Sequence, residues 1–128
     1  MRLAAWVLCL TSLGCALTPV GPLDFQVSVG AGQTIEVPSA SIRLGFRSVV
    51  GDSRCPADAL CIQAGDAIVR IEVQSAIGPW VTYDLHTGNT QPIHHDNVTI
   101  ALVELTPYPL SSRPIPPSEY RATFRVRR

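Results

Sequence analysis

Apolar and polar residues alternate with a period of two along most of this chain. Val69, Ile71 and Val73, for example, are separated by the polar residues Arg70 and Glu72. Successive side chains of a β-strand point to opposite faces, so this pattern is typical of strands with one buried and one wet face. The chain is therefore expected to be all-β. The same alternation appears in residues 24–29, 33–37, 41–47, 81–86, 98–102 and 120–127.

Turn residues divide the alternating segments at intervals of about 8–15 residues. Gly30-Ala31-Gly32, Gly78-Pro79 and Gly88-Asn89 are such turns, and no long helical period appears. This spacing predicts an antiparallel β-sandwich of about seven strands, immunoglobulin-like in architecture, with a small closed β-barrel as the alternative. A chain of 128 residues suits one domain, which we place at residues 24–128.

The first 14 residues have the layout of a secretory signal peptide. One basic residue, Arg2, precedes an apolar run over residues 3–10, and small residues follow. A transmembrane helix needs about 20 apolar residues, whereas this run gives way to Thr11 and Ser12. We therefore assign residues 1–14 to a signal peptide and expect the protein to be exported.

Leu13-Gly14-Cys15 resembles a bacterial lipobox, in which the cysteine receives a lipid and becomes the new N-terminus. The resemblance implies lipidation at Cys15 and a protein anchored in the cell-envelope membrane, on the periplasmic side. Residues 15–23 contain two Pro and one Gly and are expected to form a short tether. The sequence departs from the lipobox at Ser12, where leucine is preferred. The alternative is ordinary cleavage after Ala16, which would release a secreted or periplasmic domain.

Cysteine usage supports export. Cys9 leaves with the signal peptide and Cys15 is lipidated or lost, so that Cys55 and Cys61 remain as a pair. Outside the cytosol, a lone pair at short spacing most often forms a disulfide. A metal-binding or redox dithiol is disfavoured because both usually have the tighter spacing Cys-x-x-Cys.

Residues 51–65 interrupt the alternation and read GDSRCPADALCIQAG. They resemble a segment of small, mostly uncharacterised bacterial exported proteins, often lipoproteins, that carry Asp-Ser-Arg-Cys-Pro followed by Cys, an apolar residue, often Trp, and Ala-Gly. Residues 105–109 and the C-terminal strand resemble the same group more weakly. Gln63 stands where Trp is common, which weakens any shared binding role for that Trp. The resemblance implies export and a small β-domain, and it implies no reaction.

The side chains of this segment can brace a loop. Asp52 can accept backbone N–H groups of its own turn, and the Arg54 guanidinium can clamp Asp52, Asp58 or Asp66. Gly65 permits a positive φ before the next strand. The interpretation we favour is a cap on one end of the sandwich, and the functional alternative is a disulfide-braced recognition loop. The candidate binding residues of that loop are Asp52, Ser53, Arg54, Pro56, Asp58 and Gln63.

Three histidines and an aspartate form a second candidate site. His86, His94, His95 and Asp96 lie near the Gly88-Asn89 turn, and in an exported protein such a cluster can bind copper or zinc. Adjacent His94 and His95 would point to opposite faces of a strand. Because nothing in the spacing sets a metal geometry, we expect solvated surface histidines and no metal.

Ten basic and ten acidic residues give zero formal net charge, which argues against nucleic acid as a partner. Arg121, Arg125 and Arg127 would share the wet face of the last strand, with Arg128 beside them. They could contact anionic lipid or glycan, but we favour an edge strand that is guarded by charge against aggregation.

The function that the sequence favours is that of a bacterial cell-envelope lipoprotein with a non-enzymatic binding or scaffold domain. Its partners would be the membrane, through the N-terminal lipid, and an envelope protein or glycan. The alternatives are a periplasmic copper- or zinc-binding protein that uses the histidines, and a hydrolase or hydrolase inhibitor that acts through residues 52–65. No nucleophile-elbow pattern or phosphate-binding glycine loop supports catalysis or a cofactor.

Overall fold

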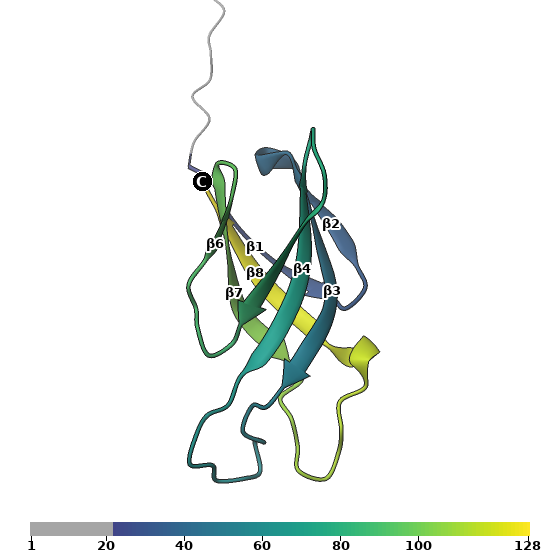
Figure 1. Cartoon of the computed structure of the whole chain (residues 1–128), viewed down its shortest axis with the longest axis vertical. Helices are drawn as coiled ribbons and strands as arrows, with labels where there is room; N and C mark the ends of the chain where they lie inside the picture. The colour runs from purple at the N-terminus through teal and green to yellow at the C-terminus, as the bar shows by residue number, and fades with distance from the viewer. Residues whose placement is uncertain (1–21) are drawn as a thin grey trace, which may run out of the picture.

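The computed structural model describes residues 22–128, which form two layers of antiparallel strands (Figure 1). The strands, in chain order, are β1 (Asp24–Gly30), β2 (Thr34–Val37), β3 (Ile42–Asp52), β4 (Ala67–Ser75), β5 (Val81–His86), β6 (Ile93–His95), β7 (Val98–Thr106) and β8 (Arg121–Arg127). Two short 3-10 helices, η1 (Pro38–Ala40) and η2 (Pro117–Glu119), each begin at a proline, which suits the first turn of a helix because it has no N–H to leave unpaired.

Each layer is a four-stranded sheet, with the order β1-β8-β7-β6 in one and β2-β3-β4-β5 in the other. β2 to β5 form a meander in one sheet, and β6 to β8 form a meander in the other. The first strand, β1, completes the second sheet by pairing with the last strand, β8, with Asp24 opposite Arg127. The sheets are open, so the predicted sandwich is confirmed and the closed-barrel alternative is wrong for the described residues. The strand order is not that of immunoglobulin domains, so the likeness to them lies in the two-layer architecture.

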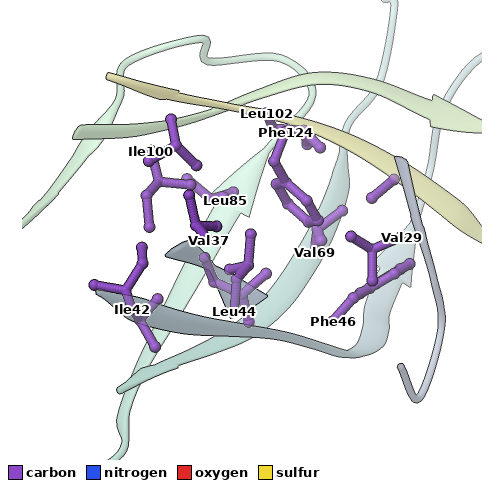
Figure 2. Close-up of a cluster of buried hydrophobic side chains, with 14 of the residues drawn as sticks. Val29, Val37, Ile42, Leu44, Phe46, Val69, Leu85, Ile100, Leu102 and Phe124 are labelled. Atoms are coloured by element: carbon purple, nitrogen blue, oxygen red, sulfur yellow. The ribbon is translucent and has the colours of Figure 1, made fainter. Parts of the chain in front are cut away.

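The core lies between the two sheets, where side chains from both layers point toward one another (Figure 2). Phe46 of β3 and Phe124 of β8 meet edge to face, with ring centroids 6.2 Å apart and an interplanar angle of 78°. Alternation sets which residues enter this core, because Val69, Ile71 and Val73 are fully buried. The other core residues include Val29, Val37, Ile42, Leu44, Leu85, Val98, Ile100, Leu102, Leu105, Ala122 and Val126.

The C-terminal strand is an interior strand, which corrects the expectation of a charge-guarded edge. β8 lies between β1 and β7. Its outward arginines reflect the fact that the outer face of a sandwich is wet even in the middle of a sheet. Arg125 donates two hydrogen bonds to Asp24 (2.8 and 2.6 Å), and Arg127 lies 3.7 Å from the same carboxylate.

The two ends of the sandwich differ (Figure 1). At one end, which we call the tether end, the Arg128 backbone N–H donates to the Leu23 carbonyl (3.2 Å) and the Arg128 guanidinium donates to the Ser39 carbonyl (2.8 Å). The hairpin between β4 and β5 extends from this same end. The opposite end, the loop end, carries the two long connections, residues 53–66 and 107–120.

Candidate functional site

A partly buried ion pair stands at the base of the loop end. The Arg54 guanidinium donates to both oxygens of Asp52, with Nε–Oδ1 at 2.9 Å and Nη2–Oδ2 at 2.7 Å. The Arg54 backbone N–H also donates to Asp52 Oδ1 (3.2 Å), and the Tyr120 hydroxyl donates to Asp52 Oδ2 (2.9 Å). Only 8% of the Arg54 side chain and 10% of the Asp52 side chain are exposed. This pair is therefore largely shielded from solvent.

Arg54 also ties the two long connections of the loop end together. Its Nη1 donates to the Leu105 carbonyl (2.7 Å) and its Nη2 to the Pro107 carbonyl (3.0 Å). The guanidinium lies 5.5 Å from the centroid of the Tyr108 ring, within reach of a cation–π contact. A planar fork with five donors suits this set of partners, whereas a lysine could not reproduce it.

The ionisation of Asp52 and Tyr120 reflects this shielded network. Burial by itself would raise the pKa of Asp52, but hydrogen bonds from Arg54 and Tyr120 outweigh burial and hold the pKa below its usual value. Burial and the hydrogen bond to Asp52 raise the pKa of Tyr120 to about 12. At neutral pH the site therefore holds a carboxylate, a guanidinium and a neutral phenol.

The disulfide-braced loop, residues 53–66, is built as a narrow hairpin. The Ser53 N–H donates to the Asp66 carbonyl (2.7 Å), and the Asp66 N–H donates to the Ser53 hydroxyl (3.0 Å). Cys55 and Cys61 form the predicted disulfide, with Cα atoms 5.9 Å apart. Gly65 has a φ of +71°, and a Cβ at this position would lie 1.8 Å from the Ser53 carbonyl oxygen. Only glycine fits there without moving the backbone.

A second contact joins the disulfide-braced loop to residues 107–120. Asp58 Oδ1 accepts hydrogen bonds from the Ser111 N–H (2.9 Å) and hydroxyl (3.0 Å). The Ala57 N–H donates to the Pro109 carbonyl (2.9 Å). Of the three carboxylates that sequence reasoning offered to Arg54, the structure therefore assigns Asp52, because Asp58 and Asp66 have other partners.

The tip of the disulfide-braced loop is apolar and exposed. Leu60 and Ile62, the two neighbours of Cys61, are fully exposed, and Gln63 is exposed beside them. Of the predicted binding residues, Asp52, Ser53 and Arg54 therefore form the base of the loop. Pro56 is half-buried, and Asp58 connects the loop to Ser111. The arrangement presents aliphatic side chains on a frame that is held by hydrogen bonds and a disulfide.

The histidines do not gather. His86 Nδ1 lies 2.5 Å from Asp66 Oδ2, and Asp66 Oδ1 accepts from the Gly88 N–H (2.8 Å). His95 instead faces Tyr83 of β5, with His95 Nδ1 2.9 Å from the Tyr83 hydroxyl. Among residues 22–128, no three His, Cys, Asp or Glu side chains come together as a metal site.

His95 is buried, with 6% exposed, which corrects the expectation that the histidines lie on the surface. Its strand β6 was too short for sequence alternation to reveal. His94 and His95 do take opposite sides, as expected for a strand, since His94 is exposed. Alternation therefore predicted the relative orientation of this pair without revealing which histidine faces inward.

Ser75 completes a polar network that sequence reasoning missed. Its hydroxyl donates to Asp96 and lies 2.9 Å from His95 Nε2. His95 therefore lies within hydrogen-bond distance of Tyr83 at Nδ1 and of Ser75 at Nε2. The network joins an edge strand of each sheet, β5 and β6.

Tyr120 was the other functional residue that sequence reasoning missed. It was predicted only as an inward-facing residue, and 68 positions separate it from Asp52.

Comparison of the chain with protein-family models, curated proteins and solved structures finds no match to any of them. Within residues 22–128, no helix has the length and hydropathy needed to cross a bilayer.

Proposed function

We propose that this chain is a lipid-anchored protein of the bacterial cell envelope whose β-sandwich is a non-enzymatic binding domain. The proposed binding site is the tip of the disulfide-braced loop, and the proposed partner is another envelope protein. The observation that carries the proposal is the pair of fully exposed aliphatic side chains, Leu60 and Ile62, on a loop whose base is braced.

Two physical arguments support a binding role for this tip. A braced loop loses little backbone entropy on binding, and its exposed aliphatic side chains gain apolar burial. Contiguous exposed apolar residues on a soluble surface commonly mark interaction sites. Leu110 and Tyr108, about half exposed on the neighbouring connection, extend the apolar character of the loop end.

The chemistry of the tip favours a protein over a glycan. Sugars are held by hydrogen bonds from well-placed polar groups, usually beside an aromatic ring. The tip itself offers Leu60 and Ile62, and Gln63 stands where the resembling proteins often carry Trp. The Tyr108 ring belongs to the neighbouring connection and lies against the Arg54 guanidinium. An apolar pocket on a partner protein is the better complement to such a surface.

Site-specific photo-crosslinking in intact cells tests the proposed binding site. A photoreactive phenylalanine analogue is placed at Leu60 or Ile62, and at Gln26, an exposed residue of β1, as the matched control. We expect a discrete protein adduct from the two tip positions and none from position 26. Equal adducts from position 26, or no adduct from either tip position, would contradict the proposal.

The intact mass of the protein from the membrane fraction tests the anchor separately. We expect the mass of residues 15–128 with a diacylglyceryl group and one acyl chain, less two hydrogens for the disulfide. A mass that fits residues 17–128 without lipid, recovered from the soluble fraction, would refute lipidation at Cys15.

A further inference from the structure

The turn between β4 and β5 forms a second exposed apolar tip, at the opposite end of the sandwich from the disulfide-braced loop (Figure 1). Residues 74–81 contain no charged side chain. Ile77 is 93% exposed, and Trp80 and Val81 are each more than one-third exposed. We call residues 76–80 the hairpin tip. A charge-free tip of this kind loses no ionic hydration when it leaves water.

The Trp80 ring is held in place on this hairpin. The Arg47 guanidinium lies 5.7 Å from the centroid of the ring and pairs with Glu72 at 2.6 Å. The Gln74 side-chain amide donates to the Gly78 carbonyl (3.2 Å), which closes the turn. The indole combines an apolar ring with one N–H donor, and such groups favour the interface between water and lipid.

A chain of contacts places the hairpin tip at the tether end. Leu23 accepts a hydrogen bond from Arg128, and Arg128 donates to Ser39 of η1. The next strand, β3, starts at Ile42, which pairs with Ser75, the last residue of β4. The hairpin tip therefore belongs to the end of the sandwich at which the tether arrives.

The short tether favours the hairpin tip as the apolar tip that meets the anchoring membrane. Seven residues, 15–21, connect the proposed lipid position to Pro22, and they span at most about 25 Å. The loop end lies farther away, because the 11 residues of β3 alone extend for about 36 Å. The hairpin tip can therefore meet a bilayer anchored at Cys15 when the sandwich stands on its tether end, whereas Leu60 and Ile62 could meet it only if the sandwich lay flat along the membrane.

We propose that the hairpin tip rests on the lipid bilayer in which Cys15 is anchored, with Ile77 and Trp80 in the headgroup region. This inference rests on the proposed lipid anchor and adds a second attachment to the same membrane. With both attachments at the tether end, the upright orientation is favoured, in which the disulfide-braced loop points away from the bilayer.

Trp80 itself reports on this contact. The sequence has two tryptophans, Trp6 and Trp80, and removal of the signal peptide leaves Trp80 alone. The mature lipidated protein is purified from membranes and reconstituted into vesicles of phosphatidylcholine and phosphatidylglycerol with brominated acyl chains. We expect its fluorescence to be quenched about twofold relative to vesicles without bromine, since an interfacial indole lies next to the acyl chains.

Matched variants separate the hairpin from the anchor. Ile77→Asp should float with the vesicles through its lipid and lose most of the quenching, whereas Ile62→Asp, at the loop end, should float and keep it. Circular dichroism and thermal unfolding confirm that both variants fold.

Each of the remaining outcomes overturns the inference. Wild-type protein that floats without quenching would refute the hairpin contact and leave the lipid anchor standing, as expected if the hairpin tip binds a protein instead. Quenching that persists in Ile77→Asp would also refute the contact. Protein that fails to float would refute the anchor and the inference that rests on it.

Discussion

Asp52 is the most connected carboxylate of the loop end, since Arg54 and Tyr120 both donate to it. Asp52→Asn should lower the free energy of unfolding by about 3 kcal/mol, because it leaves the shielded Arg54 charge without its counter-ion. Urea unfolding at pH 7 measures the loss. The matched control is Asp84→Asn, which breaks the exposed pair with Arg70 (2.9 Å) and should cost less than about 1 kcal/mol. Equal losses of stability in the two variants would contradict the view that burial makes the Asp52–Arg54 pair more important than an exposed pair.

Tyr120 should make the fold sensitive to alkali. Its pKa is raised to about 12 in the folded chain, whereas an unfolded-state phenol ionises near pH 10. The contribution of the neutral phenol is present below pH 10 and is lost as pH rises toward 12. Between these pH values Tyr120→Phe should lose less stability than the wild type, by about 2 kcal/mol. Urea unfolding of both proteins across this pH range measures the difference. The same pH dependence of the free energy of unfolding in wild type and Tyr120→Phe would contradict the prediction.

For the site around Arg54, sequence reasoning identified the right residue types but not which residues pair with one another. Arg54 was expected to clamp one of three carboxylates that lie near it in sequence. The structure shows that Asp58 is engaged by Ser111 and Asp66 by His86, and neither contact can be read from the sequence. Tyr120 directly precedes β8 and Asp52 ends β3, so the contact joins residues 68 positions apart and no local pattern predicts it.

His95 links β6 to the opposite sheet through Tyr83 and Ser75. His95→Ala should lower the free energy of unfolding by about 2–4 kcal/mol, because it removes a buried ring and leaves the Tyr83 hydroxyl without its partner. His94→Ala, at the adjacent exposed position, should change it by less than about 0.5 kcal/mol. Thermal unfolding of the two variants makes the comparison, and equal effects would contradict a linking role.

The disulfide should matter most for its own loop. In Cys55→Ser/Cys61→Ser, we expect amide hydrogen exchange to rise at least about tenfold in residues 57–63 and to stay unchanged in β3 and β4, which are held by their own ladder. Hydrogen-exchange mass spectrometry compares the two proteins. Exchange that rises throughout β3 would show that the disulfide supports the whole sandwich.

Strand prediction succeeded where alternation was long and failed where position in a sheet mattered. The segments that became β1, β3, β4 and β8 each show several cycles of the period, which defines a buried face. Alternation carries no information on lateral neighbours, so the arginines of β8 suggested an edge when the strand is interior.

The molecule as a whole separates its two apolar tips by the length of the sandwich (Figure 1). Both tips project into solvent, so Leu60→Asp and Ile77→Asp should each change the free energy of unfolding by less than about 0.5 kcal/mol, and their effects should add in the double variant. Thermal unfolding of the three variants measures this. A large loss in either single variant would show that its side chain supports the fold.

The pairing of β1 with β8 has a mechanical consequence. If tension is applied between the tether and the disulfide-braced loop, it runs nearly parallel to these strands, whereas their hydrogen bonds run across them. β1 would then have to slide along β8, which loads all seven register pairs from Asp24–Arg127 to Gly30–Arg121 together. Such shear resists rupture better than peeling a ladder one pair at a time, so the sandwich is suited to bear load along its length.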